Sequence, residues 1–198
     1  LVKSSLANEF KFETSEINIL NNGDFINAKN GKAISKNKDL EITALNFEYY
    51  KKRKFLKAYD GQLIIKSKNL NIKFNLMEFD EVNSLYTARN NVTINDVERK
   101  LEINTKEIVY NNINKTLKAN TNSTIKDKFD NIVDTESFVY NIDKGIIKIN
   151  KANLKDLDNN DFNIDSAFID VVSNKLIGKD IEINFDNQSF NKDNQPRL

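Results

Sequence analysis

Two stretches of the sequence repeat one pattern of apolar residues, and this repeat limits the folds that the chain can adopt. The stretches are Asp39–Ala58 and Lys100–Ala119, and they align without a gap, so that Leu40 matches Leu101 at a constant offset of 61 positions. An internal repeat of this kind indicates a stack of similar structural units, each of which buries its apolar face against its neighbours.

Apolar and polar residues alternate in short runs along the whole chain, as in Leu70–Phe74. Alternation with a period of two is typical of β-strands with one buried face, and the runs are rich in the β-branched and aromatic residues that strands prefer. Turn signals such as Asn30-Gly31 and Asp60-Gly61 separate the runs. The sequence therefore predicts an all-β chain.

The buried set of side chains changes parity inside each copy of the repeat. Ile42 occupies an even position, whereas Phe47 occupies an odd one. An unbroken strand cannot place both on one face, so we expect a bend or β-bulge near Leu45–Asn46 and, in the second copy, near Lys106–Glu107. Strands that each bend once and stack in register form two facing sheets. We predict an open, twisted β-jellyroll of stacked antiparallel strands, or a closely related β-solenoid, with an apolar trough inside.

The composition excludes several classes of function. The 198 residues include 30 Lys or Arg and 29 Asp or Glu, mixed along the chain, for a net charge of +1. This balance provides no basic surface for a nucleic acid. The sequence has no Cys and no His, which removes the usual residues of hydrolytic nucleophile systems and of ordinary zinc sites. We expect no catalytic residues, no cofactor and no nucleic-acid partner.

One acidic segment resembles a calcium-binding loop but departs from its pattern. The segment contains Asp156, Asp158, Asn160, Asp161 and Asp165. Asp161 stands where such a loop requires Gly, and Ala167 stands where it requires a bidentate Glu. We expect no metal site there.

The alternation of two sequence patterns resembles the OstA-type domain, the periplasmic β-jellyroll of the lipopolysaccharide transport proteins. One pattern is the pair of long copies, and the other is an Ala, a polar turn and an apolar pair, as in Leu85–Ile94. The segment Asp193–Leu198 is similar to the (N/E)xPRL segment that closes the jellyroll in the LptD family of lipopolysaccharide-assembly proteins. Gln195 stands where Glu is common, and the lack of Cys differs from enteric members, which use disulfides here. The resemblance covers residues 9–198.

The resemblance implies a division of the chain and a location for it. Residues 1–8 are expected to be an N-terminal tail or the remnant of a signal peptide, because Leu1–Ala7 contains small residues like those at the end of a secretory signal. Residues 9–190 are expected to form a periplasmic β-jellyroll domain, and residues 191–198 a linker to an outer-membrane β-barrel. The implied location is the periplasmic face of the outer membrane of a Gram-negative bacterium.

The resemblance also implies a cargo and partners. The chain is expected to bind the acyl chains of lipopolysaccharide in a hydrophobic groove and to pass them toward its own C-terminal barrel and an LptE-type lipoprotein. Acyl chains need such a groove because each exposed methylene costs about 0.8 kcal/mol in water. The residues expected to line the groove are Ile42, Phe47, Tyr49, Ile72, Phe74, Ile103, Ile108, Tyr110 and Phe138.

The first predicted strands contain Phe10 and Phe12, and then Ile17 and Ile19. The first strand of a stack exposes unpaired backbone unless another sheet pairs with it. We expect these four residues to form a docking edge for a bridge protein of the LptA type.

Three alternatives remain open at this point. The chain could be a free-standing bridge protein of the LptA type, or a structural β-solenoid such as an adhesin passenger, in which the trough is a solid core. A β-helix carbohydrate enzyme is disfavoured, because no carboxylate cluster recurs on the face of a predicted strand.

Overall fold

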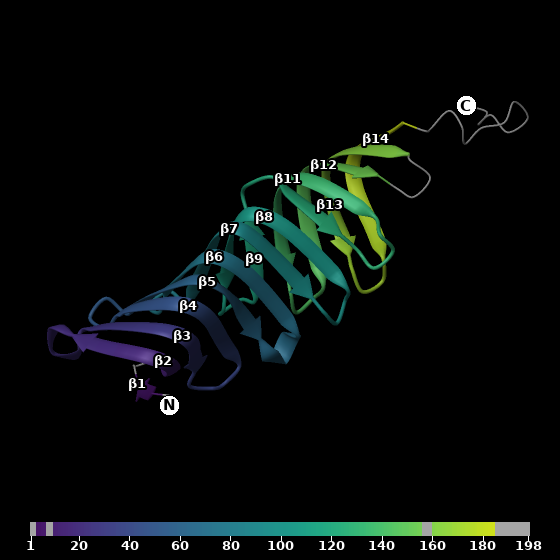
Figure 1. Ribbon diagram of the computed structural model, residues 1–198. Helices are drawn as coiled ribbons and strands as arrows, with labels where there is room; N and C mark the ends of the chain where they lie inside the picture. The colour runs from purple at the N-terminus through teal and green to yellow at the C-terminus, as the bar shows by residue number, and fades with distance from the viewer. Residues whose placement is uncertain (1–2, 7–9, 156–159, 185–198) are drawn as a thin grey trace, which may run out of the picture.

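The computed structural model describes residues 3–6, 10–155 and 160–184, and over these ranges the chain is one long, twisted antiparallel β-sheet (Figure 1). The strands follow one another in space nearly in the order of the sequence, so the molecule is an elongated stack with its first and last strands at opposite ends. The prediction of an all-β, twisted, jellyroll-like fold is confirmed.

The elements run through the described residues as follows. The strands are β1 (Lys3–Leu6), β2 (Phe10–Leu20), β3 (Phe25–Ser35), β4 (Leu40–Tyr50), β5 (Phe55–Ile65), β6 (Leu70–Asp80), β7 (Leu85–Asp96), β8 (Leu101–Asn111), β9 (Thr116–Ala119), β10 (Ser123–Lys126), β11 (Ile132–Asn141), β12 (Ile146–Lys155), β13 (Asp161–Asp170) and β14 (Lys175–Asn184), with short 3₁₀ helices η1 (Asn21–Gly23) and η2 (Lys66–Lys68). β9 and β10 are two halves of one interrupted strand, because both pair with β8 on one side and with β11 on the other. Residues 3–6 form β1 within the segment expected to be a tail, and the expected linker at 191–198 lies outside the described residues.

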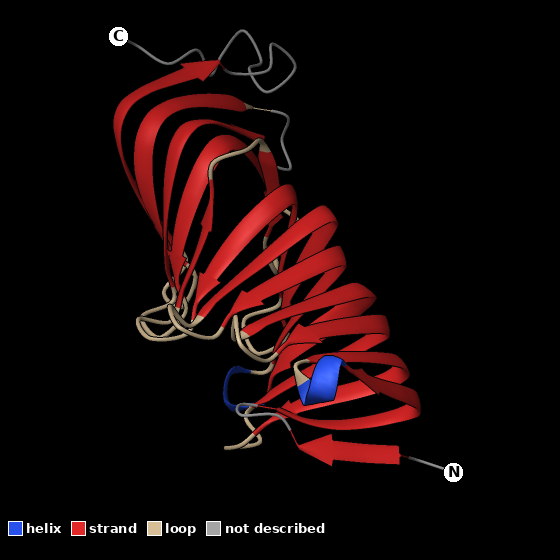
Figure 2. Ribbon diagram, turned by 90° about the vertical axis from the view of Figure 1, so that its left-hand side faces the viewer, coloured by secondary structure: helices blue, strands red, loops and turns tan. Residues whose placement is uncertain are grey.

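The long strands bend near their middle, as the change of parity predicts (Figure 2). Pairing between β3 and β4 passes from Gly31↔Ala44 to Lys29↔Asn46 and skips Leu45. The pairing of β8 with β7 also shifts register on either side of Lys106. Both predicted bends are therefore confirmed.

Residues with left-handed backbone conformation lie at these bends in alternate strands. They are Asn30, Asp60, Asn90, Lys151 and Asp180, with φ of 48°, 51°, 62°, 47° and 53°. Asn and Asp adopt this conformation more readily than other residues with a side chain, which explains why the turn-like residues of the sequence fall inside strands here. The aligned bends form a crease along the whole stack.

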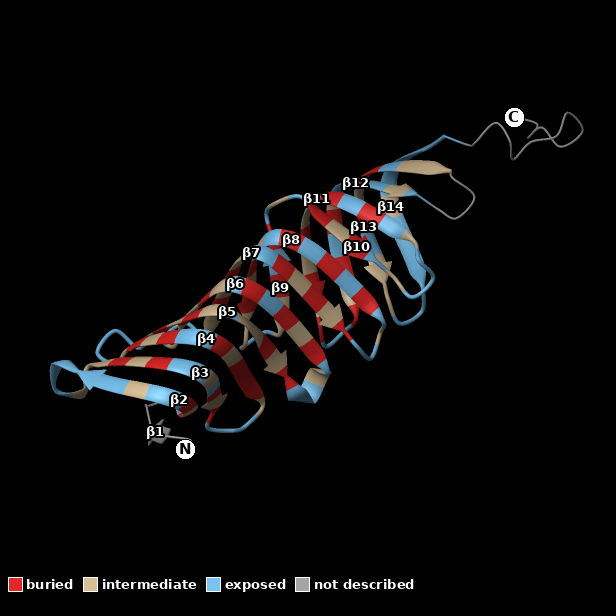
Figure 3. Ribbon diagram, in the orientation of Figure 1, coloured by how far each residue is buried: buried red, intermediate tan, exposed pale blue. Residues whose placement is uncertain are grey.

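The crease divides the sheet into two layers that face each other. Layer A contains residues 16–20, 25–29, 46–50, 55–59, 76–80, 85–89, 106–111, 116–119, 136–141, 146–150, 166–170 and 175–179, and layer B contains the other half of each bent strand together with β1 and β10. The rings of Phe12 in layer B and Phe47 in layer A are 5.7 Å apart, in an edge-to-face arrangement. Contacts of this kind place the core between the layers, where Figure 3 shows the buried bands of successive strands.

The core is built from rows of paired side chains that cross the strands. One row in layer A alternates small and large residues through the register, in the order Ala28, Phe47, Ala58, Met77, Ala88 and Ile108, all of them buried. Alternation of this kind lets side chains interdigitate at the density of a protein interior. The two layers are therefore tightly packed along this part of the stack.

Candidate functional site

The residues expected to line a lipid groove all lie between the two layers. Ile42, Phe47, Tyr49, Ile72, Phe74, Ile103, Ile108, Tyr110 and Phe138 have exposed fractions of 0 to 4%. They belong to one continuous apolar core. Phe74 also borders a hollow of 660 Å³ at the crease. The nine residues therefore lie in the apolar interior that the alternation predicts, and a lipid can enter between the layers at these positions only if the layers separate.

The turns at the ends of the two layers meet on the side opposite the crease, which we call the mouth. An ion pair of 2.8 Å joins Lys68, in a turn of layer B, to Asp143, in a turn of layer A. Deeper in the mouth, Tyr140 of β11 donates a hydrogen bond of 2.5 Å to Oδ2 of Asp96, the last residue of β7. These contacts hold the mouth closed near the middle of the stack.

Asp96 is the centre of a buried polar cluster, which we call the Asp96 clasp and which also contains Arg99 and Tyr140. The Asp96 side chain is fully buried. Its Oδ2 atom also accepts a bond of 2.8 Å from Nη1 of Arg99, and its Oδ1 atom accepts one of 3.0 Å from the Arg99 backbone N–H. Removing a partner from a buried charge of this kind is costly, so the clasp fixes the position of all three groups.

The surroundings of the clasp determine the protonation states of Tyr140 and Arg99. Burial raises the pKa of the Tyr140 hydroxyl, and the bond to Asp96 raises it further, so this hydroxyl remains a donor at neutral pH. Burial acts to lower the pKa of Arg99, but the hydrogen bond to Asp96 and the charge interactions with Tyr140, Asp96 and Glu98 together outweigh it, and the pKa is raised. Arg99 is therefore a fixed cation whose side chain is only 15% exposed.

Local turn chemistry explains how Asp96 and Arg99 come together. An Asp at the end of a strand often accepts hydrogen bonds from backbone N–H groups two or three residues later. Asp80 and Asp170 do this at the ends of β6 and β13. Asp96 makes the same turn but points between the layers, next to Leu70 and Leu101 in the paired register, and this inward position gives it Tyr140 as a partner.

A pocket of 240 Å³ opens in the mouth on the C-terminal side of the clasp, and we call it the mouth pocket. Its apolar wall consists of Leu101, Ile125, Phe129, Val133, Leu154, Ile169, Val171 and Leu176, which come from both layers. Arg99, Asp127, Lys128, Asp170 and Lys175 supply the charged side chains around it. The exposed fraction of inward-facing residues rises toward this end, to 36% at Leu176 and 41% at Ile181. The apolar interior is thus accessible from this end of the stack.

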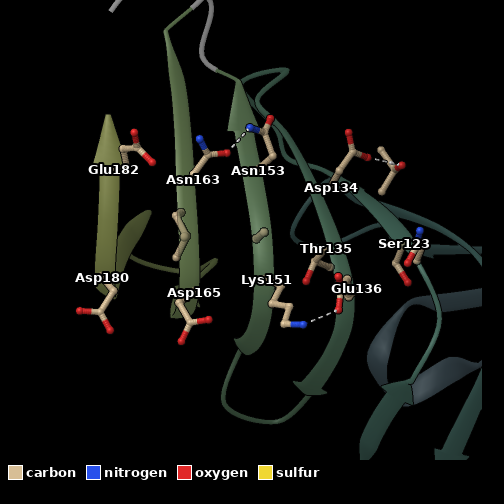
Figure 4. Close-up of a pocket in the computed structure, with 14 residues that line it drawn as sticks. Ser123, Asp134, Thr135, Glu136, Lys151, Asn153, Asn163, Asp165, Asp180 and Glu182 are labelled. Carbon is tan, nitrogen blue, oxygen red and sulfur yellow. Dashed lines mark hydrogen bonds and ion pairs between the residues drawn. The ribbon is translucent and has the colours of Figure 1, made fainter. Parts of the chain in front are cut away.

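A larger hollow of 640 Å³ lies at the crease, on the polar outer surface of the last strands (Figure 4). Its side chains pair with one another: Lys151 contacts Glu136 at 3.4 Å, and Asn153 donates to Asn163 at 2.9 Å. Asp165 and Asp180 point into solvent beside them. We regard this hollow as solvated surface, because its polar groups bond to one another or are exposed at the surface.

The structure covers part of the expected docking edge. β1 pairs with β2 from Lys3↔Thr14 to Leu6↔Lys11, so the backbone on both sides of Phe12 is paired. Phe10 and Phe12 are fully buried core residues, because their rings pack against Phe79, Phe47 and Tyr49 of layer A.

Among the described strands at the N-terminal end, the second half of β2 is uncovered, as is the outer side of β1. Ile17 and Ile19 pair with Ala28 and Ile26 of β3, and no strand of the described chain pairs with them on the other side. Ile19 is 55% exposed and Leu20 is 52% exposed. At the far end, β14 pairs only with β13 among the described strands, and its Ile177 is 70% exposed.

Several sequence expectations fall wholly or partly outside the described residues. These are the PRL segment at 193–198 and the part of the acidic segment that contains Asp156 and Asp158. Within the described ranges, we find no group of three or more acidic side chains placed to hold a metal ion, and no helix long and apolar enough to cross a membrane.

The chain matches no protein-family model and no curated protein sequence.

Proposed function

We propose that the protein binds lipid acyl chains between the two layers of its β-jellyroll and that its cargo is lipopolysaccharide. The observation that carries this proposal is the continuous apolar interior, which extends from β2 to β13 and becomes accessible at the mouth pocket. The similarity of the sequence to OstA-type domains supports the choice of cargo. The proposed location is the periplasmic face of an outer membrane.

The physical basis is the burial of methylene groups. Each methylene that leaves water gains about 0.8 kcal/mol, so an apolar path that is open at one end favours the entry of acyl chains while the sugars stay in solvent. Entry beyond the mouth pocket requires the layers to separate. The clasp and the Lys68–Asp143 ion pair oppose that separation.

The partners in this proposal occupy the two ends of the stack. An LptA-type bridge protein pairs with the free edge at Ile17 and Ile19, and the C-terminal end delivers lipid toward a barrel and its LptE-type lipoprotein. An exposed strand edge is a common site for the addition of a strand from another protein, which supports pairing at this position.

Site-specific photo-crosslinking tests the proposal. A photoreactive residue at Leu176 or Val133, on the wall of the mouth pocket, is expected to capture purified lipopolysaccharide. One at Lys73, which is exposed on the outer face of β6, is expected to capture little. Equal capture at Leu176 and Lys73 would refute binding in the interior. Capture at the buried Ile72 or Ile103 would show, in addition, that the layers open.

A structural solenoid with a solid core is the second candidate. In the middle of the stack, the tight burial of the nine expected groove residues favours this solid-core candidate. In that case, lipopolysaccharide is captured neither at Val133 nor at Ile103, while circular dichroism shows that both photoreactive proteins are folded.

A further inference from the structure

The mouth pocket has the dimensions of a site for one hydrocarbon chain. Its volume of 240 Å³ is below the roughly 300–1,000 Å³ of pockets that enclose a drug-sized ligand, so a lipid with several chains cannot enter it whole. Leu154 of layer B and Leu176 of layer A lie on opposite walls. An extended chain between them contacts apolar side chains on both sides.

The charged groups of the mouth pocket differ in how many hydrogen bonds they already make to other groups of the protein. Asp127 accepts bonds of 2.8 and 3.0 Å from the backbone N–H groups of Phe129 and Asn131, and a third from the Asn131 side chain. Asp170 accepts bonds of 2.9 and 3.0 Å from backbone N–H groups of its own turn. Both carboxylates therefore stabilise turns.

The cationic side chains of the mouth pocket have more hydrogen-bond donors available for a ligand. Lys128 and Lys175 are exposed at the mouth pocket. The guanidinium of Arg99 has five N–H donors; Nη1 bonds to Asp96, and the Tyr140 hydroxyl also lies close to the guanidinium, which leaves further donors for a ligand. With three cations and two committed carboxylates, the mouth pocket is complementary to an anion next to a hydrocarbon chain.

We propose that the mouth pocket binds a single acyl or alkyl chain that ends in a phosphate group, and that Arg99 binds the phosphate. This inference rests on the proposed function in that it assigns an anionic lipid to the accessible end of the interior. Lys175 and Lys128 supply further positive charge from the exposed rim.

The Asp96 clasp gives Arg99 its role in this site. Asp96 bonds one end of the guanidinium and the backbone of Arg99, so the side chain is held at the mouth pocket before any ligand arrives. A group that is already oriented loses little conformational entropy on binding. Asp96 and Tyr140 act as positioning residues, because they contact Arg99 or its partner and not the ligand.

The test uses two soluble amphiphiles with the same chain and different head groups. Dodecyl phosphate and dodecyl maltoside, each below its critical micelle concentration, are titrated into the whole chain by isothermal calorimetry. We expect the phosphate to bind about tenfold more tightly, because bonds between a guanidinium and a phosphate are charge-assisted. Equal affinities for the two amphiphiles would overturn the assignment of a phosphate site.

Three variants locate the site. Leu176→Glu is expected to weaken both amphiphiles about tenfold or more, because it places a carboxylate on the wall without touching the clasp. Arg99→Gln is expected to lower the affinity for dodecyl phosphate to that for dodecyl maltoside, and Lys175→Gln to lower it in part without disturbing the clasp. Arg53→Gln, in an exposed turn of layer A, is the matched control and should change neither. If Leu176→Glu leaves both affinities unchanged, the ligand is elsewhere and the proposal fails.

Two further results separate this inference from the proposed function. If inorganic phosphate at the same concentration displaces dodecyl phosphate, the site recognises a free anion and the amphiphile assignment is wrong. If Leu176→Glu abolishes dodecyl phosphate binding while lipopolysaccharide is not captured at Leu176 or Val133, the proposed function fails and the mouth pocket stands. If Leu176→Glu leaves the binding of dodecyl phosphate unchanged while lipopolysaccharide is captured at Leu176 or Val133, the mouth-pocket inference fails and the proposed function stands.

Discussion

The hydroxyl of Tyr140 donates a hydrogen bond of 2.5 Å to the carboxylate of Asp96, across 44 positions of the sequence. The bond connects β11 of layer A to β7 of layer B, and both side chains are almost completely buried. The layers therefore have a specific polar connection in addition to their apolar packing. A carboxylate in this position is tolerated because Tyr140, Arg99 and a backbone N–H satisfy it together.

Removing the Tyr140 hydroxyl should weaken the fold. In Tyr140→Phe, the buried carboxylate of Asp96 loses one of its hydrogen-bond donors, and we expect the free energy of unfolding to fall by about 1–3 kcal/mol in urea denaturation. The matched control is Tyr50→Phe, whose hydroxyl donates to Glu48 at the surface, and its effect should stay within about 0.5 kcal/mol. Equal effects of the two substitutions would show that the clasp has no special role.

The nine groove residues in the packed interior should behave as core residues. We expect Ile103→Ala to lower the free energy of unfolding by about 2–5 kcal/mol, because the side chain is fully buried and its loss leaves a cavity. Leu176→Ala, on the accessible wall of the mouth pocket, should cost about 1 kcal/mol or less. Thermal and urea unfolding of the two variants measure the difference. A small effect at Ile103 would indicate that the layers are loosely packed in solution.

Close approach of two strands at the crease requires glycine at position 61. A Cβ atom added there would lie 2.1 Å from the carbonyl oxygen of Thr43 and 2.9 Å from Cα of Ala44. Because backbone atoms cannot move aside easily, we expect Gly61→Ala to cost about 1–3 kcal/mol. Its neighbour Gln62→Ala serves as the control in the same thermal unfolding experiment, and comparable losses of stability would contradict the steric argument.

Glu41 should contribute a pH-dependent part of the stability. Its carboxylate contacts Lys32 at 2.8 Å and Lys66 at 3.0 Å, and these bonds, against the effect of burial, hold the pKa of Glu41 below its ordinary value of 4.5. Since the pKa is lower in the folded state, the stabilisation is complete above about pH 4.5 and is lost as the pH falls through the folded value.

The variant Glu41→Gln tests this sign. At pH 7 it should be less stable than the unmodified protein by about 1 kcal/mol or less, since both lysines are half-exposed. The difference should shrink below pH 4.5 in urea denaturation across the pH range. A difference that stays constant with pH would assign the effect to packing rather than to charge.

The proposed docking edge can be tested with one residue from each end of the stack. Ile19→Glu adds a charge beside the free edge of β2, and we expect it to abolish co-purification with an LptA-type bridge protein. Ile177→Glu introduces the same change at an exposed residue of β14 and should leave that complex intact. Loss of the complex in both variants, or in neither, would contradict docking at β2.

The sequence predicted the strands and their bends because both depend on local periodicity. The change of parity between Ile42 and Phe47 required a bend, and the structure has one at Leu45. Burial of the nine groove residues follows from the same alternation. Phe10 was misassigned to an edge because the short runs near it predicted two separate strands, whereas β2 is one bent strand that β1 covers along its first half.

The sequence could not predict the clasp or the mouth pocket, because both depend on the distance between the layers. The local signal for Asp96 is its place two residues after Ile94 in an alternating apolar run. Nothing in the sequence links Asp96 to Tyr140. The width of the mouth pocket depends on where the layers diverge beyond β11, which is a property of tertiary packing.

The residues with left-handed backbone conformation at the crease recur at a regular sequence interval, and this interval relates the number of residues to the length of the molecule. Asn30, Asp60 and Asn90 recur at intervals of 30 positions, and each interval contains two bent strands. Neighbouring strands are about 4.8 Å apart, so one added or deleted interval lengthens or shortens the protein by about 10 Å while its cross-section stays the same. The distance that such a chain spans can thus change in whole hairpins, with no adjustment of the interior that each hairpin encloses.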